Sequence, residues 1–142
     1  MTMPDEEAVI LYTDGACRGN PGNGGAGAVL FDKNGRVVAT AKKFLGICTN
    51  NEAEYGALIM GLKEAIESKH KNIRIFLDSE LLVRQINGKY RVKNSRLKEL
   101  MKDVRKQLSM FDGYAVEHVP RSRNKMADRL ANEAIDDELD MV

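Results

Sequence analysis

Four carboxylates of this 142-residue chain occupy positions where an apolar side chain would be expected. Asp14 and Asp78 end two strongly apolar runs, and Glu54 and Asp128 lie near the starts of two segments whose apolar residues recur at helical spacing. A buried carboxylate is costly unless a partner compensates for its charge. Four such residues need a common partner, and a cation is the simplest one.

Metal ions explain the four carboxylates better than basic side chains do, because Arg74 is the only basic residue in the two apolar runs. Divalent cations take oxygen ligands, and carboxylates that leave places for water suit Mg²⁺ or Mn²⁺. Two ions about 3.5–4 Å apart can stabilise the entering and leaving oxygens of a phosphoryl displacement. The residues alone therefore favour a nuclease or a phosphotransferase.

Two of the carboxylates also have a simpler interpretation. Asp78 or Ser79 could cap the helix that follows them. Asp128 could interact with the N-terminus of its own helix, a contribution of about 0.3–1 kcal/mol, although this would not explain its position on an apolar side. Both interpretations stay open at this point.

The elements that must position these side chains begin with three strands. Segments 8–14, 24–32 and 35–44 are rich in apolar, small and β-branched residues, and residues 32–35 have the composition of a hairpin turn. We therefore expect an antiparallel meander in which Asp14 ends the first strand and opens into a glycine-rich loop.

Helices and two further strands follow the meander. Strands are predicted at 72–78 and 114–119, and helices at 50–69, 79–88, 95–111 and 124–139, the last with Asn124 as its N-cap. A meander followed by strand–helix units predicts an α/β fold with a five-stranded mixed sheet, an antiparallel meander plus parallel strands, flanked by helices.

Length and composition indicate one folded unit. We expect a short N-terminal tail at 1–7, a catalytic domain at 8–136 and an acidic C-terminal tail at 137–142. The N-terminus lacks the pattern of a signal peptide and no run is long enough to cross a bilayer, so we expect a cytoplasmic protein, with no membrane partner, that is a monomer by default. Cys17 and Cys48 fit no zinc pattern and are expected to be reduced.

The net charge of +1 carries no overall signature of nucleic-acid binding. Basic residues nevertheless gather in one stretch, at Arg84, Lys89, Arg91, Lys93, Arg96, Lys98, Lys102, Arg105 and Lys106. Such a run is either a solvated face or a local surface that tracks phosphates.

Four motifs in a fixed order carry a resemblance to a known family. They are "TDGACRGNPGNGGAG" (13–27), "TNNEAEYGAL" (49–58), "LDSELLV" (77–83) and "RNKMADRLANEA" (123–134). Together they resemble the type 1 ribonuclease H family over nearly the whole chain. The resemblance implies a ribonuclease H-like fold and an endonuclease that cuts the RNA strand of an RNA/DNA hybrid, leaving 5′-phosphate and 3′-hydroxyl ends.

The family's four acidic positions fall on the same four carboxylates. The resemblance implies two Mg²⁺ ions, with Mn²⁺ as a substitute, at the scissile phosphate. Asp14 would bridge both ions, Asp78 and Asp128 would hold the ion on the side of the attacking water, and Glu54 would hold the other ion and sense a 2′-hydroxyl.

The resemblance also implies contacts to the substrate. The implied residues are Gly15, Ala16, Cys17, Asn20, Thr49, Asn50 and Asn51. The small residues after Asp14 would let the minor groove of the hybrid approach the backbone, where only RNA offers a 2′-hydroxyl. Turn formation or helix capping is the alternative role for the asparagines, and Thr49 and Asn50 are expected to cap a helix as well.

The chain departs from the common family pattern in two places. Residues 120–124, "PRSRN", contain no histidine where many members have one, so Arg121 or Arg123 would stabilise charge near the phosphate, as in an archaeal-like branch of the family. His118, inside the strand predicted at 114–119, is expected to be an ordinary satisfied histidine, and His70 a surface residue. The stretch 86–95 is too short for the extra basic helix and loop with which many bacterial members grip the hybrid. The basic residues of this stretch would replace that segment in part.

Other functions are less well supported. Cleavage of double-stranded RNA is a possible side activity. A non-catalytic binding module of the same fold would be expected to lack at least one carboxylate. A small-molecule kinase or phosphatase would be expected to carry a phosphate-binding loop of the form GxxxxGK[ST], which this sequence lacks.

Overall fold

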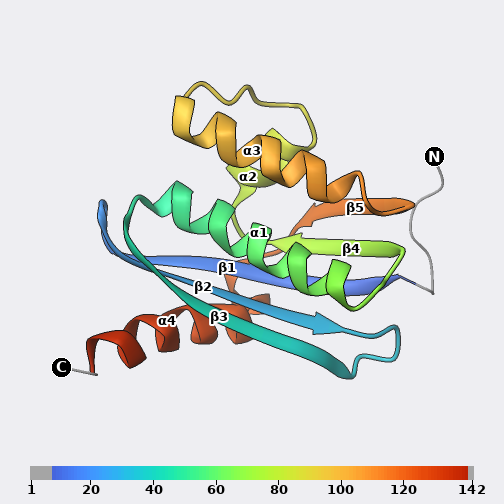
Figure 1. The fold of residues 1–142 in the computed structure, drawn as a ribbon, viewed down its shortest axis with the longest axis horizontal. Coiled ribbons are helices and arrows are strands. Elements are labelled where there is room, and N and C mark those ends of the chain that lie inside the picture. The colour runs from blue at the N-terminus through green and yellow to red at the C-terminus, as the bar shows by residue number, and fades with distance from the viewer. Residues whose placement is uncertain (1–7, 141–142) are drawn as a thin grey trace.

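Residues 8–140 of the chain are described by a computed structural model (Figure 1). The expected tail at 1–7 and the last two residues of the expected tail at 137–142 lie outside this range. The domain boundaries therefore stay a prediction.

A five-stranded sheet organises the molecule in the order β3-β2-β1-β4-β5. The strands are β1 (Val9–Gly19), β2 (Gly22–Phe31), β3 (Val37–Cys48), β4 (Asn72–Leu77) and β5 (Gly113–His118). β1, β2 and β3 pair in antiparallel fashion, whereas β4 lies parallel to both β1 and β5. The predicted mixed sheet is confirmed.

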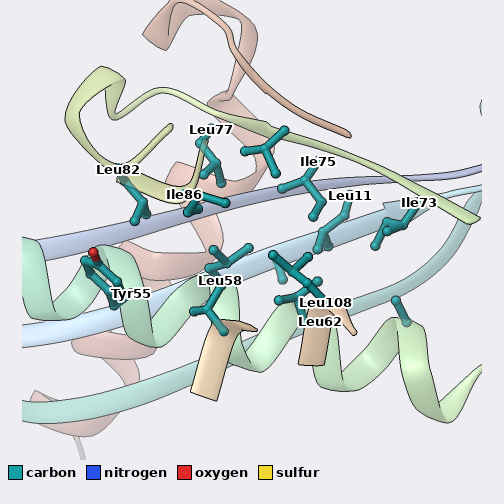
Figure 2. Close-up of a cluster of buried hydrophobic side chains, with 14 of the residues drawn as sticks. Leu11, Tyr55, Leu58, Leu62, Ile73, Ile75, Leu77, Leu82, Ile86 and Leu108 are labelled. Carbon is teal, nitrogen blue, oxygen red and sulfur yellow. The ribbon is translucent and has the colours of Figure 1, made fainter. Parts of the chain in front are cut away.

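Helices cover both faces of the sheet (Figure 1). They are α1 (Asn50–Glu67), α2 (Glu80–Ile86), α3 (Ser95–Leu108) and α4 (Lys125–Leu139), with a 3-10 turn, η1 (Arg121–Arg123), before α4. Helices α1 and α3 lie together on one side, and α4 lies across β2 and β3 on the other (Figure 1). The main apolar core fills the space between the sheet and α1–α3 (Figure 2).

The length of β1 corrects one prediction. Asp14 does not end the strand, because β1 continues to Gly19 and pairs Asp14 with Gly27 and Cys17 with Gly24. The chain reverses through Asn20 and Pro21, whose peptide bond is cis. Small residues have low strand propensity, but the facing glycines of β2 complete the hydrogen-bonded ladder, so tertiary pairing overrides the local preference.

The glycines of β2 have a packing role that the motif alone does not reveal. A Cβ at Gly27 would overlap the carbonyl oxygen of Ala127, and one at Gly25 would overlap that of Ala131, both on α4. These glycines therefore let α4 lie directly against the sheet. Because α4 carries Asp128, the close packing at Gly25 and Gly27 helps to set the position of that carboxylate.

We expect Gly27→Ala to destabilise the fold by about 1–3 kcal/mol, because the added methyl group meets helix backbone that cannot rotate away. Gly56→Ala in α1 is the matched control, since its Cβ would meet only the flexible Leu45 side chain at 3.3 Å and alanine favours a helix by roughly 1 kcal/mol. Urea unfolding of both variants checks the prediction. Equal stabilities would contradict the close approach of α4.

Candidate metal centre and nucleic-acid interface

Three carboxylates from three elements meet at one point of the sheet. Asp14 lies in the middle of β1, Glu54 lies in the first turns of α1, and Asp78 directly follows β4. One carboxylate oxygen from each lies within 4.8 Å of the others. The sequence prediction that these residues share a site agrees with this geometry.

Helix capping by neighbouring residues explains why the side chains of Glu54 and Asp78 are available. Thr49 caps α1 in a capping box with Glu52, which leaves Glu54 to point inward. Ser79 caps α2 through a bond from the Leu82 N–H, so Asp78 does not serve as the cap. Of the two residues that the sequence offered as the cap of this helix, Ser79 is therefore confirmed and Asp78 is not.

Asp128 lines the same cavity but stands slightly apart from the close trio. Its carboxylate is one of the neighbours that raise the pKa of Asp14. The side-chain amide of Asn132, one turn further along α4, donates to the Asp128 carbonyl at 3.0 Å and to its Oδ1 at 3.3 Å. The fourth predicted carboxylate is thus held at the rim of the trio by its own helix.

The electrostatics of the cluster favour a bound cation. Burial and the neighbouring Glu54 raise the pKa of Asp14 to about 10, and burial raises the pKa of Glu54 to about 7. The Gly15 N–H, which donates to Glu54 Oε1 at 2.7 Å, and the Arg121 guanidinium act in the opposite direction on the Glu54 pKa. Without a cation the carboxylates cannot all ionise together, whereas hard divalent ions with oxygen ligands fit this donor set.

The predicted substrate-binding residues surround the carboxylates in two adjoining cavities. The first, of about 350 Å³, is lined by the four carboxylates together with Gly15, Ala16, Cys17, Asn50, Asn51, Ser79 and Arg121. The second, of about 400 Å³, is lined by Asn20, Thr49, Asn50, Asn51, Glu52, Asn94, Arg96 and Leu97. The structure therefore brings all seven predicted contact residues to one continuous polar surface.

The two arginines of the loop before α4 line different cavities. Arg121 lines the carboxylate cavity, and its charge lowers the pKa of Glu54. Arg123 lines a different cavity of about 280 Å³, on the side of Tyr12 and Phe31. His118 is exposed near the end of β5 and does not line the carboxylate cavity.

Several polar residues of the site were missed by the sequence reasoning. At the start of α3, Asn94 was not singled out, and Arg96 was counted only as one of a basic run. Asn124 was treated only as an N-cap, but its side chain makes no capping bond and points instead to β1 and Asp78. Nothing in the local pattern of Asn124 distinguishes these two uses.

The two cysteines are free thiols. The Cys17 Sγ donates to the Cys48 carbonyl oxygen at 3.1 Å, and burial raises the pKa of Cys48, so its neutral form is favoured. This agrees with the expected reduced state. Within residues 8–140, no helix combines the length and apolar character needed to cross a membrane.

Comparison with known proteins places the chain in a family. Residues 12–134 match a family model described as reverse transcriptase-like. A protein of Halobacterium salinarum named ribonuclease HI is 41% identical over 138 residues, covering 96% of this chain and 69% of the relative. A bifunctional protein of Mycobacterium tuberculosis is 41% identical over 129 residues, and the chain spans only 35% of its length.

Solved structures agree with the sequence relatives. The crystal structure of ribonuclease H1 from Halobacterium salinarum superposes with a TM-score of 0.90 at 41% identity, covering 92% of this chain and 98% of that one. A compost-derived ribonuclease H1, LC11, solved in complex with an RNA/DNA hybrid, superposes with a TM-score of 0.87 at 38% identity, covering 92% and 99% of the two chains. The chain therefore belongs to the type 1 ribonuclease H family.

Proposed function

We propose that this protein is an endoribonuclease that hydrolyses the RNA strand of RNA/DNA hybrids with two Mg²⁺ ions, leaving 5′-phosphate and 3′-hydroxyl ends. The observation that carries the proposal is the convergence of Asp14, Glu54 and Asp78, with Asp128 at the rim, in one cavity bordered by residues 15–17. Family membership and a relative solved with a hybrid support the choice of substrate.

The four carboxylates would hold the metal ions. In this proposal Asp14 contributes to both ions because it lies at the centre of the cluster, Asp78 and Asp128 serve one ion, and Glu54 serves the other. Bound Mg²⁺ would activate the attacking water and stabilise the leaving 3′ oxygen, and Mn²⁺ would substitute for it. The protein's own contribution is to bring together oxygen ligands that repel one another unless a cation joins them.

Substrate selection would come from the surface beside the carboxylates. Gly15, Ala16 and Cys17 border the cavity, and in this proposal their main-chain groups would contact a 2′-hydroxyl in the minor groove. The asparagine-rich second cavity, with Arg96 and two helix N-termini, would receive backbone phosphates. The exposed basic residues between α2 and α3 would add a weaker, salt-dependent grip.

A cleavage assay on one end-labelled RNA tests the proposal. The RNA is presented as hybrid, as duplex RNA and as single strand, each with Mg²⁺, Mn²⁺ or a chelator. We expect metal-dependent cutting that is selective for the hybrid. Equal cutting of duplex RNA would replace the proposal with a broader nuclease, and hybrid binding without cutting in either metal would replace it with a binding module.

The cellular location and the oligomeric state of this protein are also proposals. From its sequence we propose a cytoplasmic monomer. Size-exclusion chromatography with light scattering would test the oligomeric state, and a mass of about two chains would contradict it.

Arg121→Ala is expected to lower kcat by about tenfold or more while changing KM little, because this guanidinium lies at the carboxylate cavity, where charge develops in the reaction. Arg123→Ala is the matched control, since Arg123 lines another cavity. Steady-state kinetics on a labelled hybrid give both constants. Equal losses in kcat and in affinity would reduce Arg121 to a simple phosphate contact.

A further inference from the structure

Asn124 sits at the junction of the elements that carry the carboxylates. Its side chain is buried, with 1% of its surface exposed. The Asn124 Nδ2 donates to the Thr13 carbonyl oxygen at 2.9 Å and to Asp78 Oδ2 at 3.1 Å. One amide group therefore joins β1, immediately before Asp14, to the carboxylate that follows β4.

The main chain of Asn124 extends the same connection to α4. Its N–H donates to the Arg121 carbonyl at 3.0 Å, closing the η1 turn, and its carbonyl accepts from the Asp128 N–H at 3.1 Å, which begins the helix. Asn124 thus bonds directly to Asp78 and to the main chain of Asp128, and it bonds to Thr13, the residue before Asp14. Glu54 is held separately, by the Gly15 N–H.

Asn124 lies at the N-cap position of α4, but its side chain makes other contacts in place of a capping hydrogen bond. Asparagine at an N-cap position normally accepts a hydrogen bond from the first turn, which stabilises the helix by about 1 kcal/mol. The Asn124 side chain makes no such bond. Its donor is directed instead at a strand carbonyl and a carboxylate, which an acceptor-only residue could not serve.

We propose that Asn124 is a positioning residue that orients the Asp78 carboxylate for metal binding. The inference rests on the proposed two-metal function. By donating to Oδ2, the amide fixes the rotation of the Asp78 carboxylate and leaves its other oxygen and remaining lone pairs directed at the cavity. Such outer partners of metal ligands typically change metal affinity or activity by about 10–100-fold when they are removed.

The test measures metal binding directly. Mn²⁺ is titrated into wild type and Asn124→Leu by calorimetry without substrate, and kcat and KM for the hybrid are then measured over a range of Mn²⁺ concentrations. Leucine keeps a similar volume but cannot donate. We expect about 10–100-fold weaker Mn²⁺ binding, a lower kcat that recovers toward wild type at high Mn²⁺, and an unchanged KM for the hybrid.

Asn87→Leu is the matched control. Its Nδ2 donates to the Val116 carbonyl at 3.2 Å and is bonded to no carboxylate, so its loss should leave Mn²⁺ binding unchanged. Asn124→Ala serves as a second variant should the leucine prevent folding.

Each outcome decides the question. Mn²⁺ binding by a folded Asn124 variant equal to that of wild type would overturn the proposal, as would a kcat loss that high Mn²⁺ does not rescue. Failure of both Asn124 variants to fold would assign the residue to the fold and likewise overturn it. A wild type that binds no Mn²⁺ and cuts no hybrid would instead overturn the proposed function.

Discussion

Asp14→Asn should abolish cleavage of an RNA/DNA hybrid, with a loss of more than roughly 100-fold in kcat. Asp14 is 6% exposed and lies beside Glu54, Asp78 and Asp128, at the centre of the proposed metal site. Asparagine keeps the size of the side chain but removes the charge that Asp14 would supply as a ligand in the proposed metal site. Single-turnover cleavage at saturating Mg²⁺ gives the rate, and near wild-type turnover would contradict the assignment of the metal site.

The same substitution should stabilise the metal-free protein. The folded-state pKa of Asp14 is about 10, against an ordinary value of 3.8. Because the folded protein holds this proton more tightly, the stabilisation is fully present below pH 3.8 and is lost as the pH rises toward 10. Glu54 adds a smaller loss between pH 4.5 and about 7. In chelator, wild type should therefore lose stability from pH 5 to pH 8.

Asp14→Asn should flatten this pH dependence and raise Tm at pH 8 by several degrees, since about 1 kcal/mol corresponds to roughly 2–4 °C for a chain of this size. Thermal unfolding in chelator at pH 5, 6.5 and 8 provides the test. Asp103→Asn is the control, because this exposed residue of α3 lies outside the carboxylate cavity. A Tm of wild type that rises over this pH range would contradict the mutual repulsion of the carboxylates.

Much of this architecture follows from patterns in the sequence. Period-two and helical spacings locate the strands and helices, and the order of elements leads to the mixed sheet. The carboxylates stand out because charge on an apolar side is rare unless something compensates for it. Asp14, Glu54 and Asp78 could therefore be grouped before their distances were known, and the structure places their oxygens within 4.8 Å of one another.

What the sequence could not provide depends on contacts between distant segments. The extension of β1 beyond Asp14 depends on the facing strand β2, and the use of Asn124 as a donor to Thr13 and Asp78 depends on the approach of β1, β4 and α4. The separation of Arg121 from Arg123 depends on the η1 turn. Local propensity contains no information about these neighbours, so each needed the folded chain.

Gly15 illustrates how a glycine can have a packing role that the sequence does not reveal. From the sequence, its small size was expected to let the minor groove approach the backbone, and this stays a prediction. In the structure, a Cβ at this position would overlap main-chain atoms of Ala53 and Glu54 at the start of α1. Packing against the helix therefore already requires glycine here.

Gly15→Ala is accordingly expected to disable the metal site rather than substrate recognition alone. The methyl group would push the first turn of α1 away from β1 and break the 2.7 Å bond from the Gly15 N–H to Glu54 Oε1. Displacement of catalytic groups by about 1 Å can cost roughly 100-fold in rate, and the overlap with backbone should also cost at least about 1–3 kcal/mol of stability.

Mn²⁺ titration and hybrid binding in chelator distinguish the two roles of Gly15. If the glycine serves the packing of α1, Gly15→Ala loses Mn²⁺ affinity and kcat, while its metal-independent affinity for the hybrid falls much less. Ala16→Gly is a useful companion, because it changes the adjacent cavity-lining residue without adding atoms, and it should keep Mn²⁺ binding. Normal Mn²⁺ binding by Gly15→Ala together with a selective loss of hybrid affinity would restore the minor-groove explanation.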